Sequence, residues 1–502
     1  MSLVLSIDAG TTGVRAFAVD ESGTTRGWAY REFAQHFPRP GWVEHDADEI
    51  WQSVCAALSE LHERLDEPIA AIGITDQRET VVAWSRSTGR PLHRAIVWQD
   101  RRTADRCRDL AEAGHLPLVR STTGLVLDPY FSASKVEWLT REGGVDLGAD
   151  TAVGTIDAWV LWNLTGGTAE RGAVHVTDTT NASRTMLFDI GRGDWSEELC
   201  ELFSVPRSVL PDVGPSSGRI GVTTDGLPIP AGIAISGVAG DQQSALFGQT
   251  CFSPGMTKNT YGTGSFVLMN VGESLPNPVD GLLSTIAWTV GDTTTYALEG
   301  SIFVTGAAVQ WLRDGLGVIG SAPEIGPLAE SVPDSGGVVM VPAFTGLGSP
   351  YWDPYARGAV FGLTRGSTRA HLARAVVESM AFQTRDVIDA MVAAGGTAVV
   401  ELRVDGGASR ADLLLGLVAD QLDVAVVRPT HEAATALGAA YLAGLAEGVW
   451  SGMDELSGIW QEDRRVDPSH GGDRSAVDAA YAAWRRAVGR IRGWARDDAA
   501  PR

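Results

Sequence analysis

Three glycine-rich turns stand beside apolar, strand-like runs in this chain of 502 residues. They are Gly10-Thr-Thr-Gly13, Gly262-Thr-Gly264 and Asp405-Gly-Gly407. Glycine lets backbone N–H groups approach phosphate oxygens closely, and threonine hydroxyls add further donors. Gly and Thr are also ordinary hairpin residues, and for any one turn alone that is the preferred interpretation. The three turns together favour a nucleotide site.

Two aspartates, Asp8 and Asp241, each end an apolar strand next to a glycine turn. A carboxylate in that position is able to hold a hydrated Mg²⁺ ion or to accept a proton from a substrate hydroxyl. It is equally able to cap the turn that follows, and spacing alone does not separate these roles.

Arg78 and Glu79 follow the apolar strand 69–74. An arginine fork beside a carboxylate suits a polyhydroxylated ligand, whereas a surface ion pair would be worth only about 0–1 kcal/mol. Trp98 is suited to pack the carbon backbone of such a ligand, although a core position is equally ordinary for a tryptophan.

The elements that position these residues are indicated by local patterns. Strands are predicted at 3–7, 14–19 and 24–33, joined by tight turns, and a helix is predicted from Asp46, with apolar residues at helical spacing up to Leu65. Strand, turn, strand differs from a dinucleotide-binding start, where the glycine turn opens a helix. The turns near residues 10 and 263 suggest an internal repeat, with a domain boundary at about 245–255.

Further along the chain, five prolines predict a loop-rich stretch at 205–232. A strand is predicted at 233–238, and a helix at 410–422 after the third glycine turn. An amphipathic terminal helix is indicated by Val477, Tyr481, Trp484, Val488 and Ile491.

Composition excludes several classes of protein. The net charge of −22 argues against nucleic acid as a partner, and no apolar run is long enough to span a membrane. Without a basic leader and with four scattered cysteines, the chain is expected to be cytoplasmic. Only Lys135 and Lys258 are lysines among 40 basic residues, and neither follows a P-loop run or a protein-kinase pattern.

An ordered set of longer motifs resembles the FGGY carbohydrate kinase family over residues 3 to about 450. The matching text includes segments 40–46, 72–80, 95–103, 123–131, 174–178, 180–188, 240–243, 259–264, 341–348, 351–358 and 437–442. The resemblance implies an α/β fold with two actin-like, ribonuclease H-like ATPase domains around a deep cleft. Residues 1–247 would form the polyol-binding domain with the first phosphate hairpin, and 248–502 the nucleotide-binding domain with the terminal helix.

The resemblance also implies a reaction: ATP-dependent phosphorylation of the small polyol glycerol to sn-glycerol 3-phosphate, with Mg²⁺. Asp241 resembles the general base. Hydroxyl-binding residues are implied at Arg78, Glu79, Tyr130 and Gln242 as well as Asp241, and apolar walls at Trp98 and Phe266. Nucleotide-binding residues are implied at Thr11, Thr12, Gly13, Arg15, Thr263, Gly306, Gln310, Gly407 and Ala411. Asp8 resembles the metal-associated carboxylate, together with Asp241. The family also implies a homo-oligomer, a dimer or a tetramer.

The chain departs from the family pattern at several positions. Ala9 replaces a common Gln, Gly13-Val14 a frequent Ser pair, Ala411 an Asn beside the nucleotide, and Asp76 a usual Asn. The loop 221–228 lacks the Gly-rich, Arg-containing pattern through which some members bind fructose 1,6-bisphosphate. It also has no histidine for activating phosphorylation, so neither form of regulation is expected.

Two rival functions remain open at the level of sequence. One is a kinase of the same family acting on another polyol or a ketose, which Arg78, Glu79, Trp98, Tyr130 and Phe266 together disfavour. The other is a non-kinase ATPase of the same superfold, such as a filament or chaperone, which would leave Arg78, Glu79 and Asp241 without a role.

Overall fold

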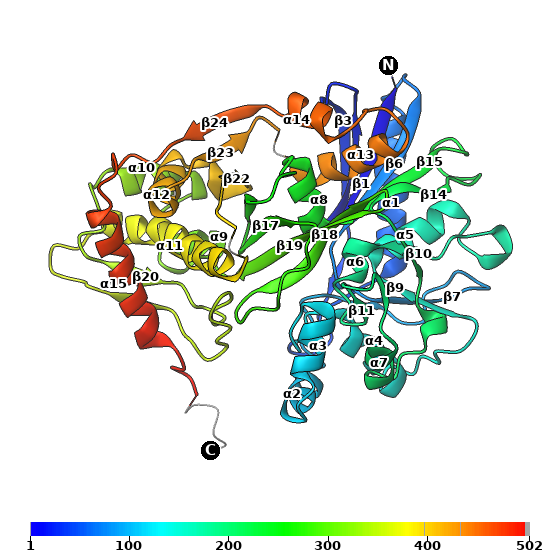
Figure 1. The fold of residues 1–502 in the computed structure, drawn as a ribbon, viewed down its shortest axis with the longest axis horizontal. Helices are drawn as coiled ribbons and strands as arrows, with labels where there is room; N and C mark the ends of the chain where they lie inside the picture. The colour runs from blue at the N-terminus through cyan, green and yellow to red at the C-terminus, as the bar shows by residue number, and fades with distance from the viewer. Residues whose placement is uncertain (1, 396, 432, 497–502) are drawn as a thin grey trace.

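The computed structural model describes residues 2–395, 397–431 and 433–496. A twisted sheet of thirteen strands runs through both halves of the molecule (Figure 1), in the order β24-β23-β22-β16-β17-β19-β18-β14-β15-β6-β1-β2-β3. Its strands are β1 (Leu3–Ala9), β2 (Gly13–Val19), β3 (Thr25–Glu32), β6 (Ile69–Asp76), β14 (Ser217–Val222), β15 (Ala234–Gly240), β16 (Met256–Tyr261), β17 (Ser265–Gly272), β18 (Leu283–Val290), β19 (Thr293–Ile302), β22 (Glu401–Asp405), β23 (Val426–Pro429) and β24 (Glu462–Val466).

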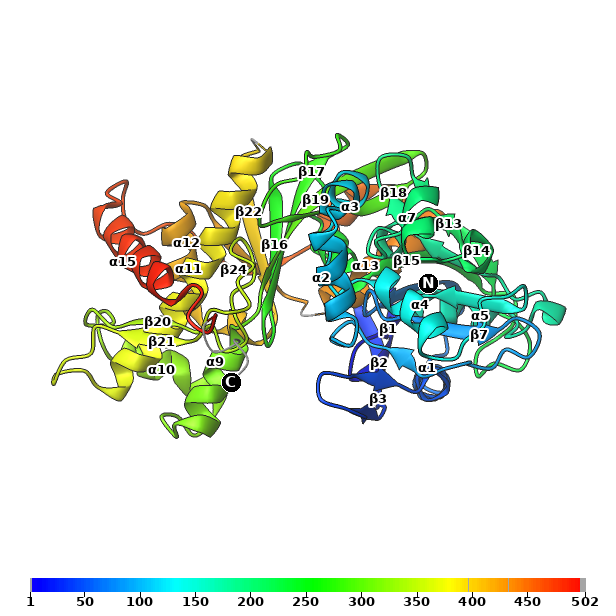
Figure 2. The ribbon, with the colours of Figure 1, turned by 90° about the horizontal axis from the view of Figure 1, so that it is seen from below.

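The sheet repeats one pattern of strands in its two halves. In β3-β2-β1-β6-β15 the first three strands are antiparallel and the last two run parallel to β1. The strands β19-β17-β16-β22-β23 are paired in the same way. The hairpins β1–β2 and β16–β17 therefore occupy equivalent places, as the repeated Gly/Thr turns suggest. The expected α/β fold with two similarly built halves, seen side by side in Figure 2, is confirmed.

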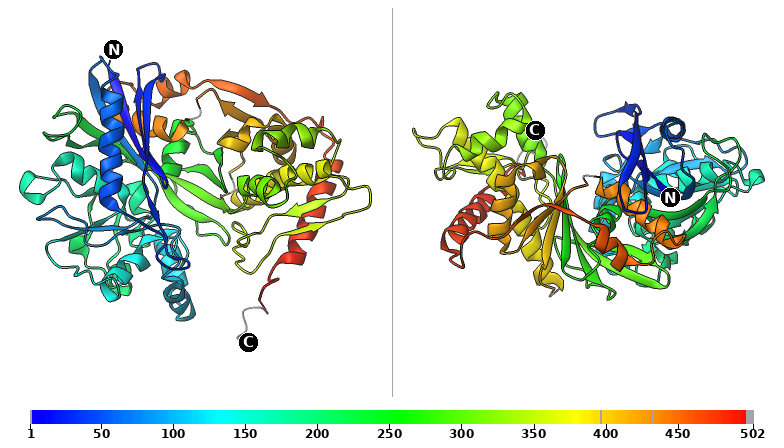
Figure 3. Two further views of the ribbon diagram at one scale, coloured as in Figure 1. Left: turned by 180° about the vertical axis from the view of Figure 1, so that it is seen from behind. Right: turned by 90° about the horizontal axis from the view of Figure 1, so that it is seen from above.

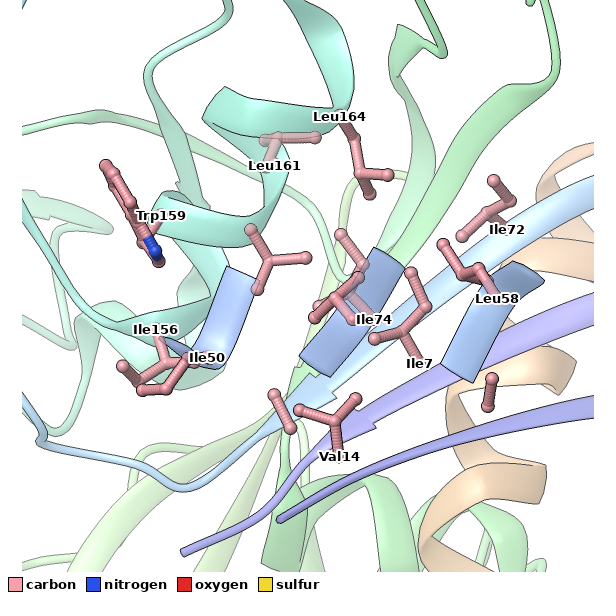
Figure 4. Close-up of a cluster of buried hydrophobic side chains, with 14 of the residues drawn as sticks. Ile7, Val14, Ile50, Leu58, Ile72, Ile74, Ile156, Trp159, Leu161 and Leu164 are labelled. Atoms are coloured by element: carbon pink, nitrogen blue, oxygen red, sulfur yellow. The ribbon is translucent and has the colours of Figure 1, made fainter. Parts of the chain in front are cut away.

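Helix α1 (Ala47–His62) shows why the first half folds as its sequence predicts. The side chain of Asp46 caps the helix by accepting hydrogen bonds from the backbone N–H groups of Asp48 and Glu49. Its apolar stripe is buried against the sheet together with α5 (Ile156–Thr165), in which every residue except Asn163 is buried. Figure 4 shows this core, in which Ile50 and Leu58 of α1 and Trp159 of α5 lie around the isoleucines of β1 and β6.

Helix α13 (Ala434–Ala446) belongs to the second half of the sequence but packs on the first half of the sheet, against β1, β6 and β15 (Figure 1). Two glycines allow this close approach: a Cβ at Gly73 would lie 2.1 Å from the carbonyl oxygen of Ala439, and one at Gly237 would lie 2.5 Å from the backbone nitrogen of Ala443. The domain boundary between residues 247 and 248 stays a prediction. Helix α13 lies after this boundary in the sequence but packs on strands that lie before it.

Two local expectations differ from the structure. The stretch 205–232 is not all loop, because β13 (Asp212–Gly214) and β14 form within it. Its prolines flank β14 and leave Ser217–Val222 free to pair. One pair, Ser217 with Val290 of β18, joins the two halves of the sheet. Helix α12 (Asp412–Leu422) begins two residues later than predicted, since 407–410 form a 3-10 turn.

The terminal helix α15 (Ser475–Ile491) packs on α11 (Arg369–Gly395), at the end of the molecule opposite β1–β3 in both panels of Figure 3. Buried Asp386 of α11 accepts hydrogen bonds from Tyr481 Oη at 2.6 Å and Trp484 Nε1 at 2.7 Å. The remaining α-helices are α2 (Ala104–Glu112), α3 (Leu116–Thr123), α4 (Ser132–Arg141), α6 (Thr179–Ala182), α7 (Glu197–Leu202), α8 (Asp241–Gly248), α9 (Gly306–Gln310), α10 (Ile325–Glu330) and α14 (Met453–Ile459). None of the described helices is both long and apolar enough to cross a membrane.

Candidate active site

Arg78 and Glu79 stand just past the carboxyl end of β6, in the middle of the sheet. Both side chains are only 2% exposed, so the interpretation as a surface ion pair does not hold. Glu79 adopts a left-handed backbone conformation, with φ +62°, which a non-glycine residue rarely adopts. Such strain persists only where the surroundings fix the residue, and here it turns the carboxylate of Glu79 back toward Arg78.

The guanidinium of Arg78 holds this part of the molecule together. It donates two hydrogen bonds to Glu299 of β19, at 2.6 and 3.1 Å, one to Gln243 at 3.1 Å, and one to Tyr130 Oη at 3.3 Å. Arg78 therefore connects β6 of the first half with β19 of the second. A bidentate arginine–carboxylate pair fixes both partners in orientation as well as distance.

Arg184 and Glu299 complete a buried group of two cations and two anions with Arg78 and Glu79. Arg184 Nε donates to Glu79 Oε1 at 2.7 Å, and Arg184 Nη2 donates to Glu299 Oε1 at 3.0 Å. Sequence reasoning missed both residues. For Glu299 the signal was a glutamate inside an apolar strand, where a charge needs a partner. For Arg184 it was only a place within one of the matching motifs.

Burial and pairing act against each other on the ionisation of this group. Burial raises the pKa of Glu79, and Arg78 and Arg184 only partly offset this effect. For Glu299 burial also acts upward, but Arg184 and Arg78 outweigh it and lower its pKa to about 2. Burial raises the pKa of the Tyr130 hydroxyl, which stays a neutral donor and acceptor.

Asp241 is the first residue of α8, and it directly follows β15. Its Oδ1 lies 3.3 Å from Arg78 Nε, and its side chain is 32% exposed, unlike the residues beneath it. A Cβ on the preceding Gly240 would lie 2.6 Å from Arg78 Cγ, so only glycine allows Asp241 to approach the guanidinium this closely. The arrangement presents one solvent-accessible carboxylate above a buried arginine.

The residues predicted as apolar walls, Trp98 and Phe266, come from the two halves of the molecule. Trp98 and Tyr130 make an edge-to-face contact with ring centroids 5.6 Å apart. Trp98 Nε1 donates to Thr11 Oγ1 at 3.0 Å, which connects the wall to the first hairpin. Phe266 of β17 pairs with Ser301 of β19, on the same face of the sheet as Glu299. The structure thus connects Arg78 with Glu79, Asp241 and Tyr130, and Tyr130 with Trp98. For Phe266 the register gives its face of the sheet.

Gln242 follows Asp241 in α8, and among the described residues no hydrogen bond joins it to Arg78. Its Oε1 accepts a hydrogen bond from the ammonium group of Lys258, a residue of β16 that sequence reasoning did not assign to the site. The neighbouring Gln243 is the glutamine that Arg78 holds.

The first predicted phosphate turn closes through a hydrogen bond from Gly10 N to Gly13 O at 3.0 Å. Thr12 and Arg15 are exposed, and the Arg15 guanidinium lies over the ring of Tyr30, 5.4 Å from its centroid. Gly13 is required for packing, because a Cβ there would meet Tyr30 and Arg31 at 2.6 Å. Gln77 Nε2 donates to Gly10 O at 3.0 Å and so attaches the turn to the end of β6, next to Arg78.

The second group of predicted phosphate-binding residues gathers around the β16–β17 turn. Gly306 N, at the start of α9, donates to Gly262 O at 3.1 Å, and Thr263 O accepts from Thr305 N and Ala307 N at 3.0 Å. Gly406 has φ +86° and lies so close to Tyr261 that a Cβ would come within 2.3 Å of its carbonyl oxygen. Thr263, Gly306 and Gly407 therefore share one location. Gln310 ends α9 and is exposed, and Ala411 precedes α12 by one residue.

The chemistry of the Asp8 and Asp241 carboxylates fits a magnesium ion. Asp8 is half-buried and accepts no hydrogen bond from any described side chain, while burial and then the charge of Asp241, partly offset by Arg15, raise its pKa to about 6. The described residues contain no cluster of three or more His, Cys, Asp or Glu side chains that could hold a metal. Mg²⁺ usually takes one or two carboxylates and completes its shell with water and phosphate oxygens, so Asp8 with Asp241 is a sufficient set.

Three features together define the class of this protein as a sugar kinase. They are the two similarly built α/β halves, the glycine turns at equivalent sheet positions, and the buried arginine under an accessible aspartate. The chain belongs to the FGGY family of carbohydrate kinases: the model of the N-terminal domain matches residues 3–248, and that of the C-terminal domain matches residues 257–447. The family membership expected from the motifs is thereby confirmed.

Within the family, the chain is similar to individual proteins over nearly its full length. The chain is 54% identical over 500 residues to glycerol kinase from Dechloromonas aromatica, covering 98% of each chain. It is 52% identical to glycerol kinase 2 from Thermotoga maritima, covering 98% of this chain and 99% of the other. Among solved structures, Plasmodium falciparum glycerol kinase with ADP superposes with a TM-score of 0.92 at 33% identity, covering 98% of each chain. Xylulose kinase from Lactobacillus acidophilus, at 21% identity and a TM-score of 0.87, shares the fold.

Proposed function

We propose that this protein is an enzyme that transfers the γ-phosphoryl group of ATP to a terminal hydroxyl of glycerol, giving sn-glycerol 3-phosphate and ADP. The observation that carries the proposal is the 3.3 Å contact between Arg78 Nε and Asp241 Oδ1. It places an accessible carboxylate directly beside the residues suited to bind hydroxyl groups. The names and full-length similarity of the relatives support glycerol as the substrate.

In the proposed mechanism, Arg78, Glu79, Tyr130 and Gln242 bind the hydroxyl groups of glycerol, and Trp98 and Phe266 enclose its carbon chain. Asp241 accepts the proton of the attacking hydroxyl as the bond to phosphorus forms. Positioning and charge neutralisation supply most of the rate enhancement in phosphoryl transfer, so no covalent intermediate is needed. A ligand without hydroxyl groups would displace water from these polar side chains without replacing its hydrogen bonds, which penalises substrates other than polyols.

Nucleotide binding is assigned to the two turns that occupy equivalent places in the sheet. Thr11, Thr12, Gly13 and Arg15 would contact the phosphates from one side. Thr263, Gly306, Gln310, Gly407 and Ala411 would hold the rest of ATP from the other. Mg²⁺, held by Asp8 and Asp241, would neutralise charge on the phosphate oxygens when bound.

The proposal extends to the setting of the enzyme. Four free cysteines and a dependence on ATP suit the reducing cytoplasm. By family resemblance the chain would assemble as a homo-oligomer, a dimer or a tetramer, and sedimentation or mass photometry at micromolar concentration would measure it.

One assay tests the proposed function. Purified protein with Mg²⁺ and ATP is supplied with glycerol, dihydroxyacetone, erythritol, ribulose or xylulose, and ADP formation is measured. We expect the highest kcat/KM for glycerol, with a product oxidised by a dehydrogenase specific for sn-glycerol 3-phosphate. A higher kcat/KM for a ketose would show that the ketose, and not glycerol, is the preferred substrate. ATP hydrolysis at a rate that no polyol changes would overturn the kinase assignment.

A further inference from the structure

The protein has only two lysines among its 40 basic residues, Lys135 and Lys258, and both are 0% exposed. Lysine is usually a surface residue, but in this protein both lysines are buried and all other basic residues are arginines. Both lysines also bond to parts of the candidate polyol site. Lys135 Nζ donates to the backbone oxygens of Tyr130 at 2.7 Å and Phe131 at 3.0 Å. Lys258 donates to the side chain of Gln242.

Lys258 lies on the inner face of β16, between the two halves of the molecule. The ammonium group donates to Gln242 Oε1 and, at 3.1 Å, to Thr260 Oγ1. Register places Thr260, Phe266 and Glu299 on the same face of the sheet. Burial lowers the pKa of Lys258 to about 8, and the negative charges of Asp405 and Asp241 act in the opposite direction.

Lys258 is fully buried and its ammonium group already donates to Gln242 and Thr260, so we expect its effect on substrate to pass through a neighbour. An ammonium group has donors only, and it therefore requires that the Gln242 amide present its oxygen. The amide nitrogen of Gln242 then faces away from Lys258. No hydrogen bond ties this nitrogen to another of the described residues, so it remains available as a donor.

We propose that Lys258 is a positioning residue of the polyol site, which locks the Gln242 amide in the orientation that offers Nε2 to a substrate hydroxyl. Without Lys258, the amide would rotate freely between two orientations, one of which presents an acceptor in place of the donor. The inference rests on the proposed function, because it takes Gln242 as a hydroxyl-binding residue. It adds a residue from the second half of the chain to a site built mostly by the first.

A double-mutant cycle tests this role. The variants are Lys258→Met, Gln242→Ala and the double variant, and the quantities are KM for glycerol and KM for ATP. We expect Lys258→Met to raise KM for glycerol about tenfold, the equivalent of one hydrogen bond between a neutral amide and a hydroxyl, and KM for ATP less than about twofold. The double variant should be no worse than Gln242→Ala alone. Effects that multiply, or an equal rise in KM for ATP, would overturn the inference.

Thr384→Val is the matched control for a structural effect on β16. Thr384 bonds Asn259 and Tyr261, which lie on the opposite face of the same strand, and it is equally buried. We expect it to leave the ratio of the two KM values unchanged even where it lowers the melting temperature. A ratio shifted as far as in Lys258→Met would show that disturbance of the strand alone is responsible, which refutes the inference.

Two further measurements are independent of turnover. The rise in melting temperature produced by glycerol should shrink in Lys258→Met and in Gln242→Ala by the same amount. Amine acylation followed by peptide mass spectrometry should leave Lys258 unmodified in the native protein, and modification there would contradict its burial.

If the wild-type protein does not phosphorylate glycerol, the proposed function fails, and the cycle is run on the polyol it accepts. If glycerol is the substrate and the cycle is additive, only the role of Lys258 fails.

Discussion

Asp241 differs from Glu79 and Glu299 in its access to solvent, because these two acids are buried. Burial suits groups that only orient a ligand, whereas a base must reach the reacting hydroxyl. We predict that Asp241→Asn lowers kcat by about 10²–10⁴-fold, because the amide keeps the shape but accepts no proton. The dissociation constant for glycerol should stay within about tenfold of the wild-type value. Steady-state kinetics with a binding measurement checks this, and a near wild-type kcat would exclude Asp241 as the base.

Glu299 neutralises two buried arginines, Arg78 and Arg184, and its loss would leave them without compensation. We predict that Glu299→Gln lowers the free energy of unfolding by about 3–5 kcal/mol, as expected when one partner of a buried ion pair is removed. KM for glycerol should rise more than KM for ATP, because Arg78 loses the group that orients it.

Asp280→Asn is the control for Glu299→Gln. Asp280 also pairs with an arginine, Arg120, but its side chain is 97% exposed. Surface pairs of this kind contribute about 0–1 kcal/mol. Urea unfolding of both variants checks the difference, and an equal loss of stability would mean that burial does not decide the importance of these pairs.

At the scale of elements, α8 and α13 hold the site through direct backbone contact. Gly438 of α13 lies so close to α8 that a Cβ would come within 1.8 Å of the Ser244 carbonyl oxygen. Since Asp241 and Gln242 begin α8, its position decides where they point. We predict that Gly438→Ala separates the two helices, lowers the melting temperature by several degrees and reduces kcat/KM for glycerol.

Gly416→Ala provides the opposite case for the same substitution. Gly416 is inside α12, and a Cβ there would have no atom within 4 Å. Alanine suits a helix better than glycine, so this variant should be more stable than the wild type by about 0.5–1 kcal/mol. Thermal unfolding of the pair checks both statements, and similar melting temperatures would contradict the role of close helix packing.

At the scale of the whole molecule, buried histidines should make the fold sensitive to acid. Burial, and secondarily His36, lowers the pKa of His45 to about 4, and burial followed by the charge of Arg86 lowers that of His175 to about 3. Both folded-state pKa values lie below the unfolded value of 6.5. Their stabilising contribution is therefore present above pH 6.5 and is lost as the pH falls toward 3. Asp178, whose pKa burial raises to about 6, acts in the opposite sense over about pH 6 to 4.

We predict that His175→Gln loses less stability on acidification than the wild type. Between pH 7.5 and pH 5.0 the wild type should lose about 2 kcal/mol more free energy of unfolding than the variant. The reason is that pH 5.0 lies one and a half units below the unfolded pKa of 6.5, and each unit is worth about 1.4 kcal/mol. Denaturant titrations at the two pH values measure it, with the partly exposed His115→Gln as a control. Parallel losses in all three proteins would show that His175 does not sense the change.

Regulation by fructose 1,6-bisphosphate is expected to be weak or absent. In the loop 221–228, Asp225 opposes an anion, and the nearby Arg219 is already paired with Glu447 of the chain segment after α13. Arg171 also contacts this loop, because its Nη2 donates to Asp225 O at 3.2 Å. Sequence reasoning did not foresee this contact. Inhibition of glycerol phosphorylation is measured at millimolar bisphosphate. Strong, saturable inhibition that Arg171→Ala or Arg219→Ala abolishes would show that this loop binds the anion.

The amino-acid sequence by itself determined the local elements. The turns at 10–13 and 262–264, the cap of α1 at Asp46 and the apolar spacing of α15 depend on residues close together in the chain, and all were predictable. The motifs also indicated the proposed polyol-binding residues Arg78, Glu79, Trp98, Tyr130 and Asp241, because each stands at the end of a predicted element or within a matching segment.

The tertiary structure alone decided which distant residues complete the site. Glu299 lies more than two hundred residues from Arg78, and Lys258 belongs to the other half of the sheet from Glu79. Local pattern shows that a buried charge needs a partner, but not which one, because the partner is brought near only when β6, α8, β16 and β19 pack. The crossing of α13 onto the first half is decided in the same way. Its fit depends on glycines in β6 and β15, and their close contacts exist only once the two halves have come together.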